Sequence, residues 1–243
     1  MRSFIFFTIL LFCCQTKLRA ESFDVTVAVA ANFAEPLKIL INDFERVHPK
    51  IKVNMVIGSS GKLFAQIQQN APFDLFLSAD QSKPLALIAS GHAIKDSLHT
   101  YAQGTLVLWS YSETPLNNES LKTFKGKLAI ANPKIAPYGE ASMEVIHHYE
   151  NPNIQIIQAN NVLGVLQYVK SQSVEMGLVA LSSLSQFPLT SLNIWHVDSA
   201  LYSPILQDMV ILNDNPHTRI FWIFLQSEQA KIVKHQFGYK DSQ

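Results

Sequence analysis

The chain lacks several kinds of residue, and each shortage excludes a class of function. Its two cysteines, Cys13 and Cys14, stand side by side in an apolar stretch near the amino terminus. The remainder of the chain therefore offers no disulfide, no thiol nucleophile and no cysteine-ligated metal site. A surplus of basic charge is also missing, because 19 basic residues are balanced by 19 acidic ones. Nucleic acid is accordingly not an expected partner.

Long apolar runs are missing beyond the first twenty residues. Residues 1–20 join a basic start at Arg2, an apolar run over 4–14 and a small residue, Ala20, at a plausible cleavage point. This order is typical of a secretory signal peptide, and the run is too short for a stable membrane anchor. Lipidation of one of the two cysteines stays open, although a large residue, Phe12, precedes them. Cleavage after residue 20 removes three of the 19 basic residues and no acidic one, which leaves 16 against 19.

Strand-like and helix-like segments alternate over the rest of the chain. Apolar strands separated by helices predict an α/β fold with parallel sheets covered on both faces. The pattern restarts near Lys127, which predicts two lobes, a ligand cleft between them and hinges near 103–107 and 202–208. The expected strands include 74–78, 105–109, 127–131, 154–157, 176–181 and 202–212, and the expected helices include 33–47, 81–90, 138–149, 162–173, 216–226 and 227–236.

Two turns between a strand and a helix are built from small residues. The first reads Ala30-Ala31-Asn32 and the second Gly58-Ser59-Ser60-Gly61. Asn32 is expected to cap the helix that begins at Phe33, with Glu35 placed as in a capping box. The first amides of a helix have no internal partner, and the helix dipole is positive there. The two turns therefore predict an anion site.

One short pattern points to an enzyme instead. Ser59 and Lys62 have the Ser-x-x-Lys spacing of serine acyl-transfer enzymes, but the Ser-Asp-Asn and Lys-Thr-Gly motifs that accompany it are absent from the sequence. The neighbouring residues His147 and His148 predict no metal pair, because adjacent helical side chains point about 100° apart. We expect no enzymatic activity, no cofactor and no resident metal.

Seven short motifs, taken together, carry a family resemblance. In this order, they make the chain resemble the periplasmic molybdate-binding proteins of ABC transporters over nearly all of residues 22–240. The motifs are Ala30–Asn32, Gly58–Gly61, Asn70–Asp80, Pro137–Gly139, Asn161–Val169, Gly177–Ser182 and Tyr202–Asp208.

The resemblance implies the two-lobed type II periplasmic-binding-protein fold, with the ligand cleft between the lobes. Lobe 1 would comprise residues 21–104 and 205–243, and lobe 2 would comprise residues 105–204, after a signal peptide at 1–20. The protein would be a periplasmic, monomeric receptor for molybdate and tungstate. It would deliver the oxyanion to the membrane permease of an ABC transporter.

The resemblance also implies which residues hold the ligand, all of them neutral. No side chain would coordinate the metal atom directly. Many family members have a ligand-binding Tyr where this chain has Ala180, so Tyr138 or Asn32 is expected to compensate. The implied donors are the side chain and amide of Asn32, the hydroxyl and amide of Ser60, and the amides of Tyr138 and Val162, with Ala31 and Ser59 adjacent.

Three alternatives stay open. The first is a receptor of the same fold for sulfate, thiosulfate or phosphate; phosphate is disfavoured because its bound proton calls for an acceptor, and the candidate turns supply donors. The second is a secreted acyl-transfer enzyme that uses Ser59 and Lys62. The third is the effector lobe of a transcription regulator, which would need a basic helix-turn-helix segment and no signal peptide.

Overall fold

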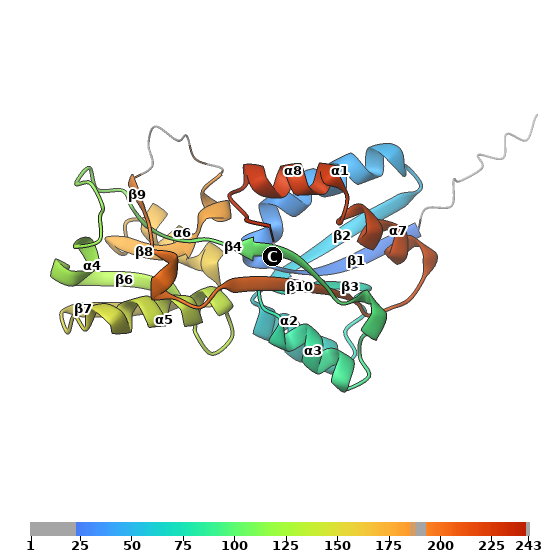
Figure 1. Ribbon diagram of the computed structural model, residues 1–243, viewed down its shortest axis with the longest axis horizontal. Helices are drawn as coiled ribbons and strands as arrows, with labels where there is room; N and C mark the ends of the chain where they lie inside the picture. Colours follow the sequence, from blue (N-terminus) through green and yellow to red (C-terminus); the bar gives the residue numbers. More distant parts are fainter. Residues whose placement is uncertain (1–22, 186, 188–192, 242–243) are drawn as a thin grey trace, which may run out of the picture.

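Two lobes, each with its own sheet, make up the part of the chain described by the computed structural model, residues 23–185, 187 and 193–241 (Figure 1). The predicted signal peptide lies outside these residues. Within the described ranges, every helix falls short of the length and apolar character that a membrane span requires.

Lobe 1 contains a five-stranded sheet in the order β2-β1-β3-β10-β4. Helices lie against both faces of this sheet (Figure 1). Its strands are β1 (Phe23–Ala30), β2 (Ile51–Gly58), β3 (Leu75–Leu77), β4 (His99–Gly104) and β10 (Ile205–Ile211). Its helices are η1 (Ala31–Phe33), α1 (Ala34–Val47), α2 (Ser60–Gln68), α3 (Ser82–Ala89), η2 (Lys95–Ser97), α7 (Pro216–Phe224) and α8 (Glu228–Gln236).

The alternation of side chains along β1 explains why both faces are covered. Val27 and Val29 share a core with Leu37 of α1 and Phe221 of α7. Ala28, which points the other way, belongs to a second core that includes Leu63 of α2. A strand that is apolar on both faces must be covered on both, which is what the sequence pattern indicates.

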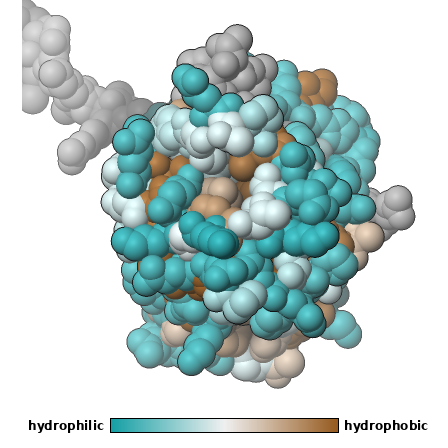
Figure 2. Space-filling model, turned by 90° about the vertical axis from the view of Figure 1, so that its left-hand side faces the viewer, coloured by the Kyte–Doolittle hydropathy of each residue, from teal (hydrophilic) through white to brown (hydrophobic). Residues whose placement is uncertain are grey.

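Lobe 2 contains a second five-stranded sheet, in the order β7-β6-β8-β5-β9. Its outer end is mostly hydrophilic, and apolar residues show there only in patches (Figure 2). The strands are β5 (Leu106–Ser110), β6 (Gly126–Ala131), β7 (Ile154–Ala159), β8 (Met176–Ala180) and β9 (Asn193–His196). The helices are α4 (Ser120–Thr123), α5 (Pro137–Tyr149), α6 (Val162–Lys170), η3 (Leu181–Leu184) and η5 (Ser199–Leu201).

The prediction of parallel sheets is wrong for both lobes, because each sheet is mixed. Strands β1, β2 and β3 are parallel, whereas β10 runs antiparallel to β3 and β4. In lobe 2, β5 runs antiparallel to β8 and β9. The strands that reverse direction, β10 and β5, are those that the chain enters as it crosses between the lobes (Figure 1). The predicted helices all form, with ends within three residues of those expected.

The carboxyl-terminal segment pairs with β4 of lobe 1 next to the crossing between the lobes. Lys240 pairs with Gln103 of β4 through two backbone hydrogen bonds of 3.0 and 3.1 Å. The preceding Gly238 has a φ of +77°, a left-handed conformation that glycine adopts without strain. This turn brings Tyr239 into the interior, where it is 5% exposed.

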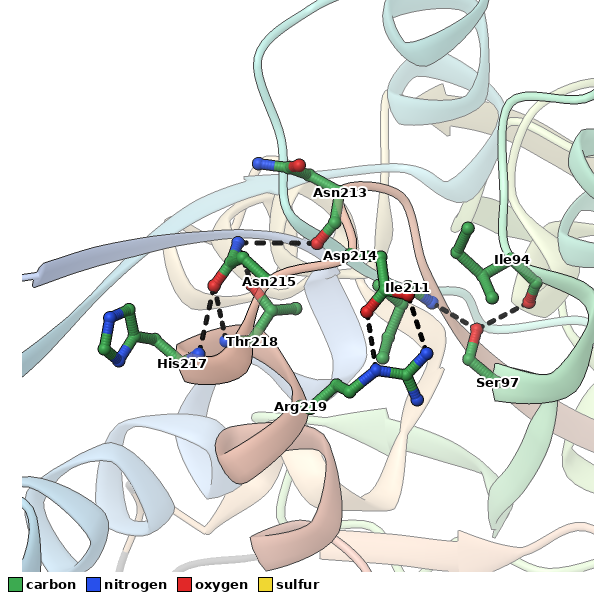
Figure 3. Close-up of polar contacts among 9 residues, drawn as sticks. All are labelled: Ile94, Ser97, Ile211, Asn213, Asp214, Asn215, His217, Thr218 and Arg219. Atoms are coloured by element: carbon green, nitrogen blue, oxygen red, sulfur yellow. Dashed lines mark hydrogen bonds and ion pairs between the residues drawn. The ribbon is translucent and has the colours of Figure 1, made fainter.

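Hydrogen bonds and an ion pair stabilise the end of β10 that leads into α7 (Figure 3). Ser97 accepts a hydrogen bond from the Ile211 amide at 2.8 Å. Asn215 caps α7 by accepting from two first-turn amides at 3.1 and 3.0 Å, and Arg219 forms a bidentate pair with Asp214. These contacts fix the connection from β10 to α7, at the end of β10 opposite the crossing between the lobes.

Candidate functional site

A small cavity lies between the lobes, where four strand-to-helix or loop-to-helix turns meet. The volume open to the centre of a water-sized sphere is about 10 Å³, about the least that admits one water molecule. All six residues proposed from the sequence line it. The lining residues are Ala30, Ala31, Asn32, Ser59, Ser60 and Ala79 of lobe 1 and Ala136, Pro137, Tyr138, Asn161 and Val162 of lobe 2.

The amino-terminal turn of α2 contributes Ser60. Ser59 caps this helix, because its Oγ accepts from the Lys62 amide at 3.4 Å. The Gly61 amide donates to the Ile135 carbonyl of lobe 2 at 2.9 Å. Among the described residues, no acceptor is found for the Ser60 amide, which is therefore free to bind a ligand. Its Oγ accepts from the Ala79 amide at 2.9 Å, so the hydroxyl hydrogen is free to donate elsewhere.

Two helices of lobe 2 contribute backbone amides. In α6, the Asn161 side chain caps the helix by accepting from the Gly164 amide at 3.0 Å, and the Val162 amide comes first in the turn. In α5, Pro137 has no amide hydrogen, and Tyr138 follows it. Within the described part of the chain, neither the Tyr138 nor the Val162 amide has a protein acceptor. Both amides thus stand at helix N-termini that line the cavity.

Asn32 behaves differently from the sequence prediction. The chain enters α1 through the 3₁₀ turn η1, so Asn32 lies inside a turn and its side chain caps no helix. Instead, its Nδ2 donates to Gln207 Oε1 at 2.8 Å and to the Tyr239 hydroxyl at 2.9 Å. Both hydrogens of the side-chain amide are used in these bonds. The group of Asn32 that remains for a ligand is its backbone amide.

The carbonyl of Asn32 is held as firmly as its side chain. The Tyr239 hydroxyl and the Ser182 hydroxyl of lobe 2 both donate to it, each at 2.8 Å. Gln207 Oε1 also accepts from the Tyr101 hydroxyl at 3.1 Å, and Gln207 Nε2 donates to the Tyr138 hydroxyl at 3.4 Å. This buried network crosses from one lobe to the other behind the cavity wall. A satisfied buried network of this kind fixes the positions of its members.

The cavity wall is electrically neutral. Among the described residues that line it, none is acidic or basic, and Tyr138 is the only one that titrates. Burial raises the pKa of the Tyr138 hydroxyl well above its usual range, and the nearby Tyr239 adds to this effect. Burial also raises the pKa of Tyr239. Both hydroxyls therefore stay protonated at physiological pH, and the wall offers hydrogen-bond donors without a compensating charge.

The enzyme alternative finds no support in this geometry. The Ser59 oxygen serves as the cap of α2, while the Lys62 side chain is exposed and outside the cavity. A nucleophile and a base would have to lie within hydrogen-bond reach of each other. No cluster of three or more His, Cys, Asp or Glu suited to a metal ion occurs among the described residues.

Three residues that support the site are not predicted from the sequence, namely Gln207, Tyr239 and Ser182. Gln207 and Ser182 fall inside two of the seven motifs, but nothing in those motifs indicates a contact with Asn32. Tyr239 lies outside the seven motifs and has no signal of its own. Ala180, which stands where the resemblance places a ligand-binding Tyr in many family members, is fully buried and does not line the cavity.

Comparisons with known proteins agree with the fold. The family model described as bacterial extracellular solute-binding protein matches residues 25–240. The molybdate-binding protein ModA of Azotobacter vinelandii is 36% identical over 230 residues, which cover 90% of this chain and 91% of the relative. ModA of Rhodobacter capsulatus is 34% identical over 230 residues, 91% of this chain and 90% of the relative.

A solved structure gives the same result in three dimensions. The Azotobacter vinelandii periplasmic molybdate-binding protein matches with a TM-score of 0.82 and 30% identity, covering 90% of this chain and all of that one. The resemblance expected from the seven motifs is thereby confirmed, as is the two-lobed α/β fold. The chain belongs to the family of bacterial extracellular solute-binding proteins.

Proposed function

We propose that this protein is a receptor that binds molybdate, or tungstate, between its lobes and delivers it to the permease of an ABC transporter. The observation that carries the proposal is the neutral cavity lined by helix N-termini from both lobes. Such a wall suits a fully deprotonated oxyanion, which accepts hydrogen bonds and has none to give. The two relatives named molybdate-binding proteins, which align over about 90% of the chain, specify the oxyanion.

The proposed donors follow from the hydrogen bonds that the protein leaves unmade. Ser60 would supply its hydroxyl and its amide, and Tyr138 and Val162 would supply their amides. Asn32 would supply its backbone amide alone, because its side chain is engaged. Ala31 and Ser59 would shape the wall beside them.

Sulfate is the second candidate, because the cavity is small. Sulfate carries the same charge as molybdate and is smaller. The cavity as it stands has room for about one water molecule, so either dianion requires the site to widen, and sulfate requires less widening. Phosphate is disfavoured on chemistry, since its monoprotonated form needs an acceptor and no carboxylate lines the wall among the described residues. The size of the closed site thus decides between the two dianions.

Ligand entry would require the lobes to separate. We propose that lobe 1 (21–104 and 205–243) and lobe 2 (105–204) move about the two chain crossings, as in hinge-closing receptors. The protein would work in the periplasm as a monomer after removal of residues 1–20. A membrane permease would receive the ligand from the closed form.

Thermal unfolding with different oxyanions tests the assignment. A ligand that binds only the folded state adds roughly 2.7 kcal/mol at a hundredfold excess over its Kd. For a chain of this size that corresponds to a rise in Tm of about 5 to 10 °C. We expect such a rise with molybdate and tungstate and almost none with sulfate or phosphate at equal concentration. Equal rises with sulfate and molybdate would favour the second candidate.

A further inference from the structure

A residue beside the cavity, Gly61, contacts the opposite lobe directly through its backbone. The Gly61 amide, next to the proposed ligand donor Ser60, donates to the Ile135 carbonyl at 2.9 Å. A methyl group at position 61 would lie 2.9 Å from the Ile135 Cα and 3.0 Å from its carbonyl oxygen. Carbon atoms in contact prefer about 3.5 to 4.0 Å. At this point the lobes can approach so closely because position 61 has no side chain.

The backbone conformation at position 61 does not require glycine. Gly61 is the second residue of α2, and its φ is outside the left-handed range. Any residue could adopt its backbone conformation, and alanine is a better helix former than glycine. Glycine is required at position 61 because Ile135 of the opposite lobe lies so close to it. A side chain at position 61 would collide with backbone atoms of Ile135, which cannot move away as the end of a flexible side chain could.

A second direct bond between the lobes lies at another part of the cavity wall. The Ser182 hydroxyl of lobe 2 donates to the Asn32 carbonyl of lobe 1 at 2.8 Å. Protein groups therefore join the lobes directly at several places, among them beside Ser60, behind Asn32 and between Gln207 and the Tyr138 hydroxyl. None of these bonds requires a ligand, and all depend on the distance between the lobes.

We propose that Gly61 is a positioning residue that sets how far the lobes close and, through closure, the affinity for the oxyanion. The inference rests on the proposed function, because it takes the interlobe cavity to be the ligand site. A side chain at position 61 would hold the lobes apart and lower the population of the closed, binding-competent form. Apparent affinity falls in proportion to that population.

The variants Gly61→Ala and Gly61→Leu test this inference by titration calorimetry and small-angle scattering with molybdate. We expect Gly61→Ala to weaken binding by about fivefold or more, since it disturbs an interlobe hydrogen bond as well as packing. The loss should be larger for Gly61→Leu. The radius of gyration with saturating molybdate should be larger in both variants than in the wild type. The melting temperature without ligand should change little in Gly61→Ala, because the alanine gained by the helix offsets the loss of the interlobe hydrogen bond.

A loss of affinity with little change in stability separates this role from a merely structural one. Lys62→Ala is the matched control, because Lys62 is the next residue of the same helix and its side chain is exposed; its affinity should stay within about twofold of the wild type. Wild-type affinity in Gly61→Ala, with the wild-type radius of gyration, would overturn the inference. Failure of the wild-type protein to bind molybdate would instead overturn the proposed function.

Discussion

Replacement of Ser60 by alanine is the sharpest test of the proposed donor set. The Ser60 hydroxyl oxygen already accepts from the Ala79 amide at 2.9 Å, so its single hydrogen is left to donate to the ligand. A hydrogen bond to a charged group contributes about 1.5 to 3 kcal/mol. Since 1.4 kcal/mol is a factor of ten, Ser60→Ala should weaken molybdate binding by about 10- to 150-fold. Titration calorimetry measures this change directly.

The same substitution also affects the ligand-free protein. Loss of the Oγ leaves the buried Ala79 amide without its acceptor, which should lower the free energy of unfolding by about 1 to 3 kcal/mol. Urea unfolding without ligand measures this part separately. The loss of affinity must therefore be determined below the unfolding transition of the variant.

The neighbouring residue provides the matched control. Ser59 has the same side chain, but its Oγ caps α2 through the Lys62 amide. Ser59→Ala should lower stability by about 1 kcal/mol, the usual cost of a lost cap, with only a small change in affinity. An affinity for Ser60→Ala within about twofold of the wild type, or a larger loss for Ser59→Ala, would refute the reasoning.

Three further predictions follow from the surroundings of the site. Tyr239→Phe removes a hydroxyl that is hydrogen-bonded to both the side chain and the carbonyl of Asn32. The substitution should lower the free energy of unfolding in urea by about 1 to 3 kcal/mol and should also weaken molybdate binding. Unchanged binding would mean that Asn32 needs no such support. Partial desolvation raises the pKa of the Glu140 carboxyl although the residue is exposed, and this effect is opposed by Lys83 and assisted by Asp80. Its charged form is therefore disfavoured in the folded state, and stability is lost as pH rises from the ordinary glutamate pKa through the raised one. Glu140→Gln should accordingly melt higher than the wild type at neutral pH and no differently below the ordinary glutamate pKa; a difference that persists in acid would contradict this. Because the cavity wall carries no charge, molybdate affinity should change by less than about threefold between low salt and roughly 0.5 M sodium chloride, whereas a tenfold fall would indicate a basic group in the site.

Local chemistry explains why much of the site could be predicted from the sequence. The turns at Ser59-Ser60 and Asn161-Val162 each combine a capping residue with a free amide in the next position, and each capping residue can be identified from the sequence. Pro137 likewise marks the start of α5. Such signals act over three or four residues, so a single sequence contains them completely.

The remainder depends on contacts that no local pattern encodes. Asn32 bonds Gln207 and Tyr239, which are 175 and 207 residues away, and these bonds change its role from helix cap to network member. The edge strands β4 and β9 were also missed, since edge strands need no continuous apolar run. The antiparallel direction of β10 and β5 follows from the crossings between the lobes, which only the folded chain defines.

Anomalous diffraction at the molybdenum absorption edge, from crystals grown with saturating molybdate, would locate the bound oxyanion itself. We expect one strong anomalous peak in the cavity between the lobes, with the oxyanion within hydrogen-bond distance of the Ser60 hydroxyl and of the Asn32, Tyr138 and Val162 amides. A peak on the surface of one lobe, or a cavity without molybdenum at saturating concentration, would contradict it.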